Sequence, residues 1–265
     1  MRKILILAAA TVTALAALTL ASCDKSYSGS GDLNSGGGSQ GGSMARFTLV
    51  GDYLYTVDSY NLNVVSVADP RKPVDIDRMY VGGQIETIFA KDDVLFMGSQ
   101  GAMYIYDISR PEFPKYRSAT SHLRSCDPVV AADTLAFVTL NNSLGNWCGA
   151  RGDMLQVYDI SDVENPELIE EVNMSSPRGL AVDIESKIVF VCDNGIKAYD
   201  ITDPRNVEGL FTAGSLPEVG RIDAYDCIVT DGRLLVIGSD GLYQLGYDRE
   251  KFTFISKIDL RREQP

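Results

Sequence analysis

Carboxylates are the side chains of this sequence whose placement could support catalysis. Four of them lie at or near the starts of short runs of aromatic and β-branched residues: Glu86, Asp127, Asp223 and Asp226. Two carboxyl groups held about 5 to 9.5 Å apart can act as acid and as base or nucleophile in glycoside hydrolysis. No local motif frames any of the four, so a glycoside hydrolase using Glu86, Asp127 and Asp223 is the alternative to a binding function.

Residue sets for nucleophilic and metal chemistry are missing from the sequence. His122 is the only histidine, no Gly-x-Ser-x-Gly elbow occurs, and no cysteine lies near a second basic partner. Neither zinc ligands at their usual spacing nor the alternating ligands of an EF-hand are present. The Asp-Pro turns resemble calcium loops, but Asp in such turns normally caps its own backbone. We therefore expect no metal, no cofactor and no enzymatic activity.

A recurring stretch indicates the elements that must position these side chains. The Tyr-Asp-Ile-Ser-Asp stretch at 158–162 returns in altered form at 65–70, 106–111, 199–204 and 245–248. Aligning the copies superposes Ser66, Asp107, Asp159, Asp200 and Gly246, so the spacings are 41, 52, 41 and 46 residues. Periods of this length are typical of propellers, solenoids and arrays.

Each unit has the pattern of four β-strands. In the first unit these are 47–50, 53–57, 62–67 and 74–80, with turn residues such as Asp52 and Pro70 between them. A linear solenoid would use shorter repeats, whereas five four-stranded blades can close into a ring that hides its edges. The sequence predicts an all-β fold, a β-propeller of about five four-stranded blades spanning residues 44–262.

The copies at 63–70 and 195–204 look like the LVIVD repeat of β-propeller proteins from bacterial surfaces. The resemblance covers all five units, about residues 44–260. It implies the propeller fold but no particular activity, because that family has no established one. Ser66 and Gly246 depart from the repeat in the first and last copies.

In a propeller, the segments that lead into the innermost strands emerge on one face. They bring the following polar residues: Arg46, Gln84, His122 with Arg124, Arg178 and Arg221. Around the axis these residues would give the channel mouth positive charge, which suits an acidic sugar, a carboxylate or a phosphate. The alternative is that each Arg pairs with a neighbouring carboxylate such as Asp127 or Asp223. The opposite face collects Asp-rich turns and should be acidic.

The third unit exceeds its neighbours by 52 minus 41, or 11 residues, and the excess falls in 141–152. This insert holds Trp147, the only Trp, and loops that depart from a repeat are the usual place for binding. We expect Trp147 to be an exposed contact, the alternative being that it packs over its blade. The predicted binding face comprises Trp147, Arg124, His122, Arg178 and Arg221.

The cysteines divide into two pairs. Cys126 and Cys148 are predicted to lie at the same face and to form a disulfide, which would stabilise an exported protein by roughly 3 kcal/mol. Cys192 and Cys227 lie in apolar strand patterns and are expected to be buried thiols, with a bridge between them as the less favoured alternative.

The start of the chain predicts export and anchoring. Arg2 and Lys3 precede an apolar run at 4–21, as in a secretory signal peptide. The stretch 20–23, Leu-Ala-Ser-Cys, resembles the lipobox of bacterial lipoproteins, where the Cys carries acyl chains such as palmitate; an uncleaved anchor helix is the alternative. We predict a signal peptide at 1–22, and a lipidated Cys23 with a flexible Gly/Ser-rich tether at 23–43.

The net charge and the predicted cellular location together favour a binding function. The 36 acidic and 24 basic residues give a net charge of -12, which argues against a nucleic-acid partner. A lipid anchor would hold the protein at the bacterial envelope, at the outer membrane or cell surface, although Asp24 leaves the inner membrane open. We expect a non-catalytic module that binds an unknown protein or glycan.

Overall fold

Five four-stranded sheets make up most of the computed structural model, which describes residues 42–121, 128–141 and 152–260. All of these residues belong to the second of the two units into which the chain divides, Gly36–Pro265. Each sheet is antiparallel and uses four strands in chain order. The strands of the first three sheets are β1 (Phe47–Val50), β2 (Tyr53–Val57), β3 (Asn61–Ser66), β4 (Val74–Tyr80); β5 (Ile85–Lys91), β6 (Val94–Ser99), β7 (Ala102–Asp107), β8 (Lys115–Ser121); and β9 (Val129–Ala132), β10 (Leu135–Leu140), β11 (Met154–Asp159), β12 (Glu167–Asn173).

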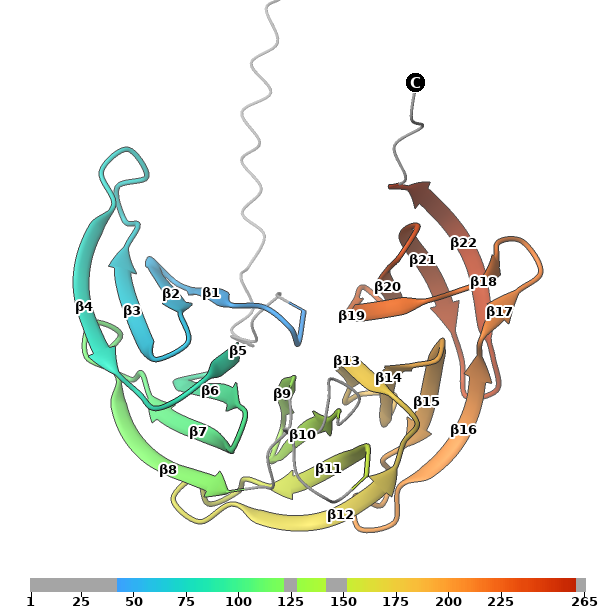
Figure 1. Ribbon diagram of the computed structural model, residues 1–265, viewed down its shortest axis with the longest axis horizontal. Coiled ribbons are helices and arrows are strands. Elements are labelled where there is room, and N and C mark those ends of the chain that lie inside the picture. Colours follow the sequence, from blue (N-terminus) through green and yellow to red (C-terminus); the bar gives the residue numbers. More distant parts are fainter. Residues whose placement is uncertain (1–41, 122–127, 142–151, 261–265) are drawn as a thin grey trace, which may run out of the picture. The chain divides into compact units, whose positions relative to one another are not determined.

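A short hairpin separates the fourth sheet from the fifth. The remaining strands are β13 (Pro177–Asp183), β14 (Ile188–Asp193), β15 (Ile196–Asp200), β16 (Glu208–Ala213); the hairpin β17 (Ser215–Leu216) and β18 (Gly220–Arg221); and β19 (Ala224–Thr230), β20 (Arg233–Gly238), β21 (Gly241–Tyr247), β22 (Phe252–Asp259). The first strand of every sheet is the innermost and the fourth the outermost, as Figure 1 shows. The prediction of a β-propeller with four-stranded blades is confirmed.

Burial follows the position of each strand within its blade. The second strands of the middle blades, such as β10 and β14, are buried along their whole length because neighbouring blades cover both of their faces. The outermost strands, such as β4, are mostly exposed. Val, Ile, Phe and Tyr suit such a half-buried or fully buried pleated surface.

The turn between the first two strands is tight in every blade. Each contains a residue with positive φ: Gly51, Asp92, Asp133, Lys187, and Asp231 with Gly232. Four of these turns have two residues, a length that matches the right-handed twist of the flanking strands and favours Gly and Asp. The turn between β13 and β14 has four residues, 184–187. This turn therefore fixes the register of the innermost strand against its neighbour.

The recurring stretch lies at the same end of the blade as this turn. In each of the three best copies, the Asp carboxylate accepts a hydrogen bond from the backbone N–H two residues on: Asp107 to Ser109, Asp159 to Ser161 and Asp200 to Thr202, at 2.7 to 2.9 Å. The residue between these two partners is Ile108, Ile160 or Ile201. Its N–H donates to a carbonyl of the first turn in the same blade. The most recognisable sequence feature is thus explained by turn formation and blade closure.

Neighbouring blades pack through their inner strands. β5 contacts β1 and β2, β9 contacts β5 and β6, β13 contacts β9 and β10, and β19 contacts β13 and β14. Among the described residues, no comparable contact joins β1–β4 to β19–β22. Each sheet is made of four consecutive strands, so the first and last blades share no strand.

Candidate functional site

Three of the five inner strands carry a β-bulge near their start. The register shifts at Glu86 in β5, at Arg178 and Gly179 in β13, and at Tyr225 in β19. Because a bulge adds an unpaired residue, it redirects side chains out of the regular alternation, and bulges are common beside functional sites. The inner strands of a propeller start on one face, so the three bulges mark a common level of the molecule.

Arg178 is the best-defined side chain at this level. Its Nη1 atom lies 2.9 Å from Asp223 Oδ1 and 3.3 Å from the carbonyl oxygen of Ala224. Its guanidinium carbon lies 5.0 Å from the centre of the Tyr225 ring, a cation–π distance. The side chains of Arg178 and Asp223 are 38% and 47% exposed, so the ion pair contributes little to stability. It orients the guanidinium while leaving further N–H groups available to a ligand.

Arg221 lies two residues before Asp223, in β18. Its side chain is exposed and has no ion-pair or hydrogen-bond partner among the residues that the structure describes. Of the expected Arg set, Arg178 is therefore paired, as one of the two alternatives had it, and Arg221 has no partner within the described ranges.

Glu86 and Gln84 stand at the corresponding start of β5. Gln100 donates a hydrogen bond from Nε2 to Glu86 Oε1 at 3.0 Å. Gln84 has a φ of 58°, and its carbonyl oxygen accepts a hydrogen bond from the Gln100 N–H at 3.2 Å. The hydrolase alternative uses Glu86, Asp127 and Asp223, of which the structure describes Glu86 and Asp223. Both of these carboxylates have hydrogen-bonded partners.

Asp226 occupies a more enclosed position than the sequence indicated. Ser43 Oγ donates to Asp226 Oδ1 at 2.8 Å, the Met44 N–H donates to Oδ2 at 3.2 Å, and the Cys227 N–H donates to Oδ1 at 2.9 Å. Burial raises the pKa of Asp226 despite these donors, since desolvation disfavours the carboxylate. Gly179 is also close: a Cβ atom built there would lie 2.1 Å from Asp226 Oδ1.

Two of the three partners of Asp226, Ser43 and Met44, belong to residues 42–46, which we call the strap. Ser43 is 1% exposed, although the sequence placed it in the flexible tether, and its hydroxyl also accepts a hydrogen bond from the Leu180 N–H at 2.8 Å. Further on, the carbonyl of Ala45 accepts from the Ile88 N–H and that of Arg46 from the Val57 N–H, both at 2.9 Å. The strap therefore links the first blade to the second, fourth and fifth.

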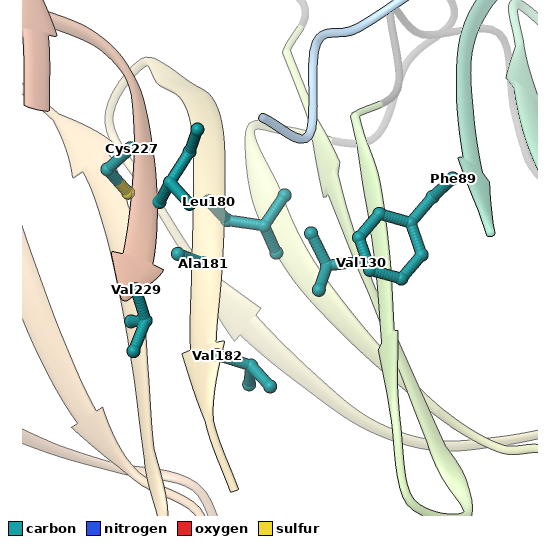
Figure 2. A pocket seen from close by; sticks show the side chains of 8 residues that line it. Phe89, Val130, Leu180, Ala181, Val182, Cys227 and Val229 are labelled. Atoms are coloured by element: carbon teal, nitrogen blue, oxygen red, sulfur yellow. The ribbon is translucent and has the colours of Figure 1, made fainter. Parts of the chain in front are cut away.

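Four inner strands surround an apolar pocket of about 80 Å³. Its walls come from β5, β9, β13 and β19, and Figure 2 shows Leu180, Val130 and Phe89 directed toward one another across it. Cys227 is the only side chain in this lining with a titratable group. The pocket could hold an apolar group but offers no acid or base pair.

Several predicted site residues lie outside the described residues: Cys23, His122, Arg124, Cys126, Asp127, Trp147 and Cys148. The predicted disulfide and residues 142–151 of the insert are therefore among the residues that the structure does not describe. Within the described ranges, no group of three His, Cys, Asp or Glu side chains could hold a metal ion. In the same ranges no helix has the length and apolar character to cross a membrane.

Comparison by sequence finds no match among known protein families, and none among curated proteins. Comparison by structure finds many similar folds. A protein of unknown function from Desulfotomaculum acetoxidans superposes with a TM-score of 0.63 at 11% identity, over 81% of this chain and 69% of the other. The periplasmic gluconolactonase of Pseudomonas aeruginosa gives 0.59 at 11% identity, over 79% and 68%. A luciferin-regenerating enzyme gives 0.54 at 14%, over 84% and 77%.

These likenesses define the class of protein, an all-β propeller, and at such low identity they show the fold alone. No particular protein follows from them, because the similar structures include both enzymes and a protein of unknown function.

Proposed function

We propose that this protein is a lipid-anchored β-propeller of the bacterial envelope that binds an anionic ligand, a glycan or an acidic protein surface, without catalysis. The observation that carries the proposal is the Arg178 guanidinium, held over the Tyr225 ring by Asp223. A guanidinium oriented in this way can present two parallel donors to a carboxylate or phosphate. Arg221, which is exposed and two residues before Asp223, adds a second cation near the same strand start.

The anchoring rests on the sequence. The lipobox-like stretch ending at Cys23 and the Gly/Ser-rich residues after it fit a domain tethered to lipid by acyl chains. The repeats that resemble the LVIVD family fit an envelope protein. Labelled palmitate should enter the wild-type protein in a bacterial host and should not enter the Cys23→Ser variant; equal labelling of both would refute lipidation at this residue.

A hydrolase function has weaker support. Glu86 accepts a hydrogen bond from Gln100, and Asp223 is paired with Arg178, so neither is free to serve as a proton carrier without losing its partner. Two of the similar structures are named as enzymes, but that likeness extends to fold alone. The wild-type protein should show no glycosidase activity, so Glu86→Gln and Asp223→Asn should have no activity to lower. A wild-type activity that both variants abolish would support the hydrolase instead.

The binding test uses an array of acidic glycans together with capture of envelope proteins. We expect binding by the wild type and a loss of at least tenfold in Arg178→Ala, because an oriented charged donor contributes roughly 1.5 to 3 kcal/mol. Arg221→Ala should weaken binding less. Arg205→Ala, an exposed Arg on an outer turn that pairs with Glu167, is the matched control and should bind as the wild type does. Unchanged binding by Arg178→Ala would refute this site.

A further inference from the structure

Two cysteines meet where the fourth blade packs on the fifth. Cys192 lies in β14 and Cys227 in β19, and these strands are in contact. The two residues are 0% and 2% exposed and belong to one apolar core cluster. The Cys192 thiol is the largest cause that raises the pKa of the Cys227 thiol, and the structure holds both cysteines in the free form. Two buried thiols from contacting strands thus share one core at the boundary between two blades.

The surroundings of this pair suit a structural role more than a reactive one. The core cluster around it supplies apolar groups such as Phe190, Ile196 and Ala224. Each cysteine has a neighbouring carboxylate that is already bound: Asp226 is hydrogen-bonded to the strap, and buried Asp193 pairs with Lys197. The hydrogen bond with Cys192 and burial both raise the pKa of the Cys227 thiol, so the thiolate is scarce in the folded protein. Oxidation would therefore occur during folding, while both thiols are exposed.

The position of the pair matters because the fifth blade is attached mainly to the fourth. It packs through β19 on β13 and β14, and among the described residues its remaining link to the first blade runs through the strap. A covalent bond across β14 and β19 would hold the last blade at its main attachment. No other described cysteines lie at a blade boundary.

We propose that Cys192 and Cys227 form a disulfide that joins the fourth and fifth blades of the exported protein. The proposal rests on the proposed envelope location, because disulfides persist in oxidising compartments. The oxidant is a donor disulfide, of an oxidoreductase or of a small thiol. One cysteine thiolate attacks the donor and releases one donor thiolate; the second cysteine then displaces the other. In sum, two protein thiols become a disulfide and the donor gains two electrons and two protons as two thiols.

The bond joins residues of two strands that are already in contact and share one core cluster. A disulfide holds its sulfur atoms about 2.05 Å apart. It would close a loop of 227 minus 192, or 35 residues. A loop of that length should raise the thermal midpoint of unfolding by roughly 7 to 14 °C relative to the reduced protein.

The test examines the full chain in two preparations: one recovered from the envelope of a bacterial host, and one refolded in a buffer of oxidised and reduced glutathione. Free thiols are alkylated under denaturing conditions, and peptides are mapped without reduction. We expect a linked Cys192–Cys227 peptide in both preparations, and a lower unfolding midpoint after reduction. The Cys227→Ala variant should show alkylated Cys192; if that variant does not fold, the wild-type map still decides.

The two preparations separate the proposals. Alkylated Cys192 and Cys227 in the refolded protein would overturn the disulfide. A linked peptide after refolding, with both thiols alkylated in the cellular preparation, would leave the pairing intact and count against the proposed envelope location. A link from either residue to Cys126 or Cys148 in both preparations would also overturn the proposal.

Discussion

Replacing Ser43 with Ala tests whether the strap holds the propeller together. The Ser43 hydroxyl donates to Asp226 Oδ1 and accepts from the Leu180 N–H, each at 2.8 Å. The substitution removes both hydrogen bonds without adding volume. It leaves a buried backbone donor on β13 without its partner and a buried carboxylate with one donor fewer.

The expected loss is about 2 to 4 kcal/mol in the free energy of unfolding. An unsatisfied buried donor costs about 1 to 3 kcal/mol, and a hydrogen bond to a charged group contributes about 1.5 to 3 kcal/mol; part of this is recovered by relaxation. The Asp226 carboxylate still keeps two backbone donors, from Met44 and Cys227. The loss of unfolding free energy in Ser43→Ala should therefore be smaller than the loss expected if all three donors to Asp226 were removed.

The assay is urea unfolding, combined with amide hydrogen exchange read blade by blade. Exchange should accelerate most in β19–β22, because Asp226 links the strap to that blade. Ser215→Ala, at an exposed Ser in β17, is the control and should change the free energy by less than about 0.5 kcal/mol. If Ser43→Ala behaves like Ser215→Ala, the strap carries no stability and the reasoning fails.

The pH dependence gives a second check. Burial raises the folded-state pKa of Asp226, so its contribution favours the folded state at low pH and is lost as pH rises from about 3.9 through the folded value. Because the Ser43 hydroxyl acts to lower that pKa, the Ser43→Ala variant should differ most from the wild type at neutral pH. A gap that widens on acidification would contradict this assignment.

Two further substitutions probe close packing and acid stability. Gly179→Ala should strongly lower the thermal midpoint of unfolding, because the added Cβ would lie 2.6 Å from the Asp226 Cα. Gly101→Ala is the control and should be tolerated, because a Cβ there meets nothing within 4 Å. Equal midpoints for the two variants would refute the close contact at Gly179. Hydrogen bonds from Ser109, followed by Arg117, hold the pKa of Asp107 at about 2, so its stabilisation is present above about 3.9 and lost as pH falls toward 2. Asp107→Asn should flatten that acid limb of the unfolding free energy, and an unchanged limb would show that Asp107 does not contribute.

The fold was predictable because the three middle blades repeat the same local chemistry. An Asp that bonds the N–H two residues on, followed by a buried Ile, recurs at Asp107, Asp159 and Asp200 with spacings that only the insert interrupts. Alternating aromatic and β-branched residues then indicate strands, and the period indicates blades. The contacts that form the strap were not predictable, since Ser43 is 183 residues from Asp226 and stands at the end of a Gly/Ser-rich stretch.

The candidate site was predictable only in outline. The sequence indicated that Arg178 and Arg221 precede inner strands, and it left open whether Arg178 pairs with a neighbouring carboxylate. The ion pair with Asp223 and the ring contact with Tyr225 depend on a bulge, which inserts one residue and redirects the side chain. The alternation of inward and outward residues along a strand has a period of two and does not show where a bulge inserts an extra residue. The sequence pattern therefore could not locate the bulge.

What distinguishes one blade from another is therefore where specificity can arise. The Asp–Ile stretch is the same in several blades and serves the same turn in each, so it cannot select a ligand. The bulge positions are structurally equivalent, yet they hold different side chains: Glu86, Arg178 and Tyr225. A carboxylate, a guanidinium and an aromatic ring at one level of a propeller form an asymmetric set of acceptor, donor and stacking surface. Under the proposed function, this difference between blades would let the propeller orient a ligand that has both charge and a flat face, which a ring of identical residues could not do.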